Sequence, residues 1–185
     1  MYTVLLDMDG VVADLTNTLL DQYNYLTNEK IAIDQIKSTK TFKWVGDPML
    51  MKKLLECPGF MRGLPPIDGA IEGVEKLVKL GYDVVFVSNA TNGPTSGHEK
   101  REWLKFYFSK TWTKYVPLIL THQKYRVRGD VLLDDDPKNF ENLRETKGLL
   151  FNQPYNASLI VSGNVERIYG WDHFLDWLSI NGEVK

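Results

Sequence analysis

Short apolar runs recur along the chain and are separated by longer stretches with helical periodicity. Each run is nearly continuous in its hydrophobicity, which is typical of parallel strands that are covered on both faces. The runs are Tyr2–Leu6, Tyr82–Val87, Val116–Thr121, Asp130–Leu133 and Gly148–Phe151. We therefore expect these segments to form a central parallel sheet.

Several of the remaining stretches have the apolar spacing of amphipathic helices. Asp68 is a suitable N-cap for a helix that passes through Ile71–Leu80 and stops at Gly81. The others cover Gly97–Phe108, Pro137–Glu145 and Trp171–Ile180. Strands that alternate with helices predict βαβ units. The expected fold class is therefore α/β, a Rossmann-like three-layer sandwich with a central parallel sheet.

One long segment breaks this alternation. Between the first strand and the helix that leads to the second lie residues 15–66, with helical patterns at Thr16–Leu26 and Pro48–Leu55. A compact core needs only a short connection there. We therefore expect a small, mainly helical cap inserted after the first strand, with residues 1–14 and 67–185 forming the catalytic core.

Composition and charge limit the classes of binding partner and the cellular compartment that we expect. The 185 residues include 22 Lys and Arg against 24 Asp and Glu, so no basic field for polymeric nucleic acid is expected. A single cysteine, Cys57, excludes an internal disulfide and fits a reducing compartment. No apolar run is long enough to span a membrane, and we expect no leader before the first strand. We expect a soluble cytoplasmic protein that acts on a small molecule.

Acidic residues follow two of the predicted strands. Asp7 and Asp9 come directly after the first strand, where Gly10 allows a turn, and the run Asp134–Asp136 follows the fourth. In an open α/β sheet, ligands bind outside the carboxyl ends of the strands. Carboxylates that meet there make a place for a divalent cation, and their hard oxygens suit Mg²⁺.

Donors for phosphate oxygens follow the other strands. Ser88 and Asn89 come after the second strand, and Lys124 lies between the third and fourth. Each also has a simpler interpretation, as a turn residue or a solvated loop lysine. Lys114 and Arg126 are alternative cations near Lys124.

These residues occur in the order of four motifs that identify a known superfamily. The chain resembles the haloacid-dehalogenase-like phosphatases in the first motif DxDG (Asp7–Gly10), the second (Ser88), the third (Lys124) and the fourth GDxxxD (Gly129–Asp134). Within that superfamily it is most similar to the 5′(3′)-deoxyribonucleotidases, whose first motif reads DMDGVLAD where this chain has DMDGVVAD. It departs from their pattern at the second motif, where they have a Thr-Ser pair.

The resemblance implies a role for each motif. Asp7 would be the nucleophile that forms an aspartyl-phosphate, and Asp9 the general acid and base. Asp7, the backbone carbonyl of Asp9 and Asp134 would bind Mg²⁺, while Ser88 and Lys124 hold the phosphate. Asp135 would bind a metal-bound water or hold Lys124.

Substrate recognition is expected in the cap and around the second motif. Phe42, Trp44 and Phe60 could stack on a base, or they could form a small core for the cap itself. Arg62 is a candidate ligand for phosphate or sugar, with a surface charge as the alternative. Lys100 is similar to a phosphate-proximal lysine of the deoxyribonucleotidases, or it lies on a solvated helix face.

The predicted function is Mg²⁺-dependent hydrolysis of deoxyribonucleoside 5′(3′)-monophosphates through an aspartyl-phosphate. Another superfamily phosphatase, acting on a sugar phosphate or on the 3′-phosphate ends of nucleic acid, is the alternative. A non-catalytic nucleotide-binding protein is favoured less, because Asp7, Asp9, Lys124 and Asp134 are all present. The sequence leaves open whether the chain forms a homodimer.

Overall fold

A single parallel sheet forms the centre of the molecule. The structure, a computed structural model, describes residues 1–36, 45–89, 93–112 and 117–182. Within these ranges the strands are β1 (Thr3–Leu6), β2 (Asp83–Ser88), β3 (Leu118–Leu120), β4 (Val131–Asp134), β5 (Lys147–Phe151) and β6 (Val165–Ile168). They pair in parallel in the order β3-β2-β1-β4-β5-β6. The predicted α/β class with a central parallel sheet is confirmed.

The strand order places the site at a defined point. The chain adds β2 and β3 on one side of β1, then crosses to add β4, β5 and β6 on the other. Leu6, the last residue of β1, pairs with both Phe86 and Leu133, so β4 ends one residue and β2 two residues beyond β1 at the same edge of the sheet. Ligands of open α/β sheets bind where the order reverses, which here is between the carboxyl ends of β1 and β4.

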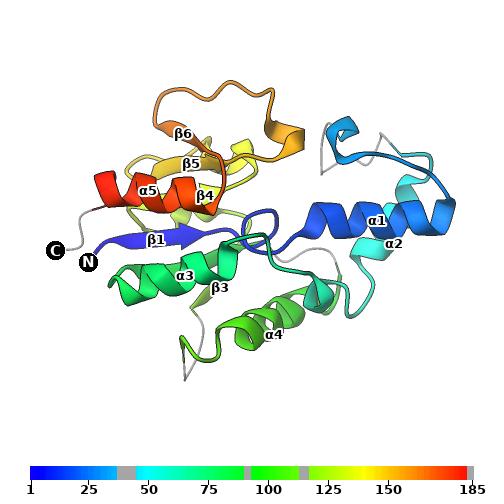
Figure 1. The fold of residues 1–185 in the computed structure, drawn as a ribbon, viewed down its shortest axis with the longest axis horizontal. Coiled ribbons are helices and arrows are strands. Elements are labelled where there is room, and N and C mark those ends of the chain that lie inside the picture. Colours follow the sequence, from blue (N-terminus) through cyan, green and yellow to red (C-terminus); the bar gives the residue numbers. More distant parts are fainter. Residues whose placement is uncertain (37–44, 90–92, 113–116, 183–185) are drawn as a thin grey trace.

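The helices of the described residues are α1 (Leu15–Thr27), α2 (Pro48–Leu55), α3 (Ala70–Lys79), α4 (Ser96–Phe108) and α5 (Trp171–Asn181). Of these, α3, α4 and α5 cover one face of the sheet (Figure 1). Figure 1 shows α3 and α5 beside each other against the sheet. Val4, Leu6 and Phe86 of the strands join Val74 and Trp103 in the main buried cluster. Continuous apolar strands thus supply every second side chain to this layer.

The opposite face is covered by short turns. Leu5, Val87 and Leu132 pack there with Phe140. The covering segments include the 3₁₀ turn η4 (Pro137–Phe140) and Val127, which directly follows the 3₁₀ turn η3 (Lys124–Arg126).

Two sequence expectations fail in this region. The helix predicted over 137–145 is only the 3₁₀ turn η4, because the backbone N–H of Asp136 and the side chain of Asn139 both bond back to Asp134. The strand β6 was not predicted, because only Val165 and Ile168 of its four residues are apolar. The two charged residues between them reflect the position of β6 at the edge of the sheet.

The segment between β1 and α3 contains the predicted helices. Asp14 caps α1 by accepting from Asn17 N, and Asp47 caps α2 by accepting from the backbone N–H groups of Met49 and Leu50. In Figure 1, α1 and α2 lie side by side beyond the carboxyl end of β1. The division into core and cap stays a prediction, and Phe42 and Trp44 lie outside the described residues.

No helix in the described parts of the chain is long and apolar enough to cross a membrane.

The contact between α3 and α5 yields a test of the packing. A Cβ added at Gly73 of α3 would lie 2.3 Å from a ring carbon of Trp171, whereas one at Gly63 meets nothing within 4 Å. We expect Gly73→Ala to lower the free energy of unfolding by about 1–3 kcal/mol through overpacking, despite the better helix propensity of alanine. Urea denaturation measures this, and Gly63→Ala is the matched control. Equal stabilities for the two variants would contradict the packing described.

Candidate active site

Asp7 stands at the carboxyl end of β1, nearly buried between β2 and β4. Its backbone N–H donates to the carbonyl of Leu133 at 2.9 Å, which continues the sheet pairing by one residue. Its Oδ1 accepts from the backbone N–H of Met8 at 2.6 Å and lies 2.8 Å from Nζ of Lys124. The side chain is therefore fixed in place, with one oxygen engaged.

Lys124 connects two of the acidic residues. Its Nζ lies 2.8 Å from Oδ1 of Asp7 and 2.7 Å from Oδ2 of Asp134, and its side chain is almost fully buried. Burial alone would lower the pKa of Lys124, but Asp134 and Asp7 outweigh it and raise the pKa. The lysine is a permanent cation at this point. Of the alternative cations, Arg126 is exposed and Lys114 lies outside the described residues.

Asp134 is the most enclosed acid of the site. It is inaccessible to solvent and accepts from Asn139 Nδ2 at 2.8 and 2.9 Å and from Asp136 N at 3.0 Å. Burial raises the pKa of Asp134 to about 6, with Lys124 opposing the rise and Asp7 adding to it. Asp136 itself caps η4 by accepting from Lys138 N at 3.1 Å.

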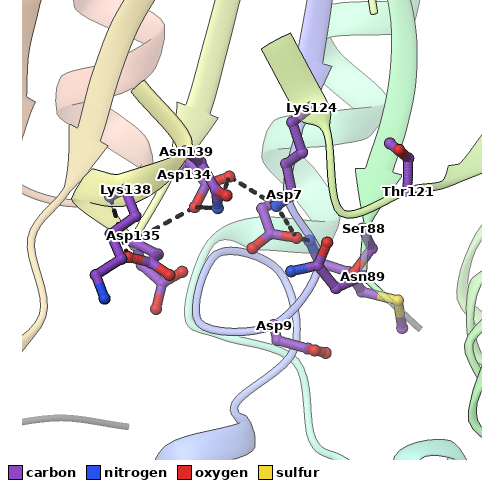
Figure 2. A network of polar contacts seen from close by, with 12 residues as sticks. Asp7, Asp9, Ser88, Asn89, Thr121, Lys124, Asp134, Asp135, Lys138 and Asn139 are labelled. Carbon is purple, nitrogen blue, oxygen red and sulfur yellow. Dashed lines mark hydrogen bonds and ion pairs between the residues drawn. The ribbon is translucent and has the colours of Figure 1, made fainter. Parts of the chain in front are cut away.

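Asp135 completes an acidic triad with Asp7 and Asp134. Carboxylate oxygens of the three residues all lie within 4.8 Å of one another, and all three residues are buried (Figure 2). Burial raises the pKa of Asp135 well above its usual range, and Asp134 and Asp7 raise it further. Lys124 pairs with Asp7 and Asp134 and not with Asp135. Crowded hard oxygens with too few cations fit a divalent cation such as Mg²⁺.

A second buried lysine, Lys100, contacts predicted site residues at or just after the carboxyl ends of β1 and β2. Nζ of Lys100 on α4 lies 2.5 Å from Oδ2 of Asp9, 2.8 Å from Oγ of Ser88 and 2.8 Å from the carbonyl oxygen of Asn89. Lys100 is fully buried, so the solvated helix face considered in sequence is wrong. The structure thus brings the end of β2, the loop after β1 and α4 together around one ammonium group.

Two polar atoms in this half of the site lack partners. Oδ1 of Asp9 and Oδ1 of Asn89 are buried, and neither has a hydrogen-bond partner among the described residues. Burial raises the pKa of Asp9, Lys100 opposes the rise and Asp7 adds to it. Leaving a buried acceptor unpaired costs about 1–3 kcal/mol. Both atoms are therefore available to polar groups of a ligand.

Of the candidate substrate residues in the cap, the structure describes Phe60 and Arg62. Phe60 is 7% exposed and belongs to the main buried cluster rather than to a separate core of the cap. Arg62 is exposed, and its backbone N–H donates to Oε2 of Glu99 at 3.3 Å. No contact of the Arg62 side chain with Asp7 or Lys100 is seen.

Sequence reasoning missed several polar residues that support the site. Glu99 accepts from the backbone N–H of Gly59 at 2.7 Å and from Oγ1 of Thr95 at 2.6 Å, which ties the segment before α3 to α4. Tyr155 donates to Oδ2 of Asp135, and Asn139 donates to Asp134. For Glu99 the signal was present, because it occupies an inward position of an amphipathic helix.

Comparison with known proteins gives a consistent family likeness. A family model described as "5' nucleotidase, deoxy (Pyrimidine), cytosolic type C protein" matches residues 1–180. A Bordetella pertussis protein assigned as a 5′(3′)-deoxyribonucleotidase is 31% identical over 159 residues, covering 83% of this chain and 84% of that protein. A Staphylococcus aureus protein with the same assignment is 29% identical over 179 residues, covering 94% and 96%.

A solved structure shares the fold. The D,D-heptose 1,7-bisphosphate phosphatase of B. bronchiseptica, complexed with magnesium and phosphate, matches with a TM-score of 0.60 at 10% identity. The match covers 98% of this chain and 100% of that one. At this identity the likeness shows the fold alone.

The Glu99 contacts predict a pH-dependent contribution to stability. Burial raises the pKa of Glu99, but the hydrogen bonds from Gly59 and Thr95 outweigh it, so the pKa is lowered. Such a carboxyl stabilises the fold above its ordinary pKa and loses that contribution as pH falls through the lowered value. We expect Glu99→Gln to cost about 1–3 kcal/mol at pH 7 and less below about pH 4.

Urea denaturation at both pH values measures this difference. Glu102→Gln is the control, because Glu102 lies on the same helix and makes no polar contact with any described residue. A pH-independent loss in Glu99→Gln would show that its charge contributes nothing.

Proposed function

The chain belongs to the family described as 5′ nucleotidase, deoxy (pyrimidine), cytosolic type C, and is a haloacid-dehalogenase-like phosphatase; we propose that it hydrolyses deoxyribonucleoside 5′(3′)-monophosphates with Mg²⁺. The observation that carries this proposal is the buried cluster of Asp7, Asp134 and Asp135 bridged by Lys124 at the carboxyl ends of β1 and β4. That position and donor set suit a phosphoryl group beside a metal ion.

The first chemical step uses Asp7 as the nucleophile. Because Oδ1 is held by Met8 N and Lys124, Oδ2 is the oxygen that attacks phosphorus. A new bond forms between this oxygen and phosphorus while the ester bond breaks, and Asp9 gives its proton to the departing sugar oxygen. The products are the nucleoside and an aspartyl-phosphate.

The second step regenerates the enzyme. A water molecule attacks the phosphorus of the aspartyl-phosphate, Asp9 accepts its proton, and the bond to Asp7 breaks to release inorganic phosphate. Lys124, Lys100 and the hydroxyl of Ser88 are the proposed donors to the phosphate oxygens, with Lys100 exchanging one of its contacts to Asp9, Ser88 and Asn89 for the phosphate. Fixed donors around the transferring group are the main contribution of a protein to phosphoryl transfer.

The acidic triad supports the assignment of Mg²⁺ as cofactor. Asp7, Asp134, Asp135 and the backbone carbonyl of Asp9 would hold the ion. When bound, it offsets the repulsion between the Asp7 carboxylate and the phosphate, about 4 kcal/mol for unit charges 4 Å apart at an effective dielectric near 20. Hard oxygen ligands favour this ion over softer metals.

The cap is proposed to recognise the nucleoside. The position of α1 and α2 beyond the carboxyl end of β1 supports a cap formed by residues 15–66 over the site. Because Phe60 is buried in the core, Phe42 and above all Trp44 are the proposed base-stacking residues. The cytoplasmic location that Cys57 suggested in sequence also remains a proposal.

The substrate class is tested by an assay of phosphate release. Purified protein is given dUMP, dTMP, their 3′ isomers and a panel of sugar phosphates, each with and without MgCl₂. We expect hydrolysis of the deoxyribonucleotides that disappears with EDTA and returns with Mg²⁺. Turnover of sugar phosphates alone would overturn the substrate assignment, and unchanged turnover in EDTA would overturn the metal.

The nucleophile is tested by Asp7→Asn. The amide cannot form the aspartyl-phosphate, so phosphate release should fall by roughly 10⁴-fold or more. Nucleotide binding, measured by calorimetry, should persist because Lys100, Ser88 and the cap are unchanged. Asp21→Asn, an exposed acid on α1, is the control that should keep full activity. A fully active Asp7→Asn would exclude Asp7 as the nucleophile.

A further inference from the structure

The segment after β5 contacts two separate parts of the acidic site. We call residues 152–156 the β5 loop; none of them was singled out in the sequence. Nε2 of Gln153 donates to the carbonyl oxygen of Gly10 at 2.7 Å, in the turn that follows Asp7 and Asp9. The hydroxyl of Tyr155 donates to Oδ2 of Asp135. The loop therefore connects the turn of the nucleophile with the acid that follows β4.

The turn at Gly10 packs closely against the side chains of Asp135 and Tyr155. Gly10 has φ +76°, and a Cβ there would lie 2.5 Å from Oδ2 of Asp135 and 2.8 Å from the hydroxyl oxygen of Tyr155. Glycine is thus required at position 10 both for its backbone conformation and for the space that Asp135 and Tyr155 occupy.

The β5 loop is itself anchored by a buried amide, that of Asn156, to β6 and to the chain that follows β4 and β5. Asn156 is 1% exposed, and its Nδ2 donates to the carbonyls of Asp135 and Phe151, both at 2.9 Å. Its Oδ1 accepts from Gln153 N at 3.0 Å and from Nη1 of Arg167 on β6 at 2.9 Å. All four hydrogen-bonding positions of this buried amide are filled, so the loop is a rigid support.

The rigid β5 loop counteracts the electrostatic repulsion between Asp135 and its two acidic neighbours. Asp135 lies beside Asp7 and Asp134 but has no ion pair with Lys124, so repulsion drives its carboxylate away from the other two. A hydrogen bond from Tyr155 to one carboxylate oxygen fixes the rotation of the side chain. Fixing this oxygen keeps the carboxylate of Asp135 beside those of Asp7 and Asp134.

We propose that Tyr155 and Gln153 are positioning residues that hold Asp135 and the Gly10 turn in the geometry that binds the divalent cation. The inference rests on the proposed function, because it assumes that the acidic triad holds Mg²⁺. Tyr155 contacts neither phosphorus nor the nucleophile in this account. It acts through Asp135, so its loss should weaken the metal site and leave the chemistry of Asp7 and Asp9 intact.

The test is Tyr155→Phe, which removes one oxygen and keeps the ring. We expect the Mg²⁺ concentration for half-maximal activity to rise about 10-fold, with kcat at saturating Mg²⁺ and KM for the nucleotide nearly unchanged. Calorimetric titration of the nucleotide-free protein with MgCl₂ should show the same 10-fold weakening. Tyr169→Phe, at a tyrosine that is 69% exposed, is the matched control and should leave both values unchanged.

A second variant tests the hydrogen bond from Gln153 to the carbonyl oxygen of Gly10. Gln153→Met removes the donor to Gly10 at similar size, and we expect it to weaken Mg²⁺ binding in the same direction. Thermal unfolding in EDTA reports whether each variant folds. If either folded variant shows the predicted weakening, the loop positions the site.

Two results would overturn the inference, and they are distinguishable. Unchanged Mg²⁺ binding in both folded variants, or activity losses that saturating Mg²⁺ cannot restore, would refute the positioning role alone. A wild-type protein that neither binds nor needs Mg²⁺ in the same experiments would refute the proposed function and this inference with it.

Discussion

The buried lysine bridge between Asp7 and Asp134 is the interaction on which the site depends. Two carboxylates at the ends of neighbouring strands cannot be buried side by side without a cation, and Lys124 supplies it at 2.8 and 2.7 Å. Because that cation comes from η3, the chain between β3 and β4 must pass over the sheet just beside β1. The strand order with β1 next to both β2 and β4 makes this possible.

The parts of the site that follow strand ends were predictable from sequence. Asp7, Ser88 and Asp134 each come at the carboxyl end of a buried apolar run, and parallel pairing brings such ends together whatever else the chain does. The same periodicity gave the sheet and most helices. It failed for β6 and for 137–145, where an edge position and side-chain bonds to Asp134 decide the local structure.

Two contacts could not be predicted from the sequence because they join residues that are far apart in the chain. Tyr155 to Asp135 and Gln153 to Gly10 depend on how β5 is placed beside β4, which no local pattern encodes. Lys100 is different, because positions 96, 99, 100, 103 and 104 form one buried face of α4. Two charged residues on an otherwise inward face indicate buried partners, and that pattern is visible in the sequence.

The charges gathered at the site explain why a divalent cation suits it. The site holds four carboxylates, those of Asp7, Asp9, Asp134 and Asp135, and two buried ammonium groups, those of Lys100 and Lys124. With all of them ionised, the cluster carries an excess of two negative charges, which one divalent cation cancels. Neither lysine forms an ion pair with Asp135. The orientation of the Asp135 carboxylate is instead fixed by a neutral donor, the Tyr155 hydroxyl. A neutral donor orients a carboxylate without neutralising its negative charge. That charge therefore remains available to a metal ion.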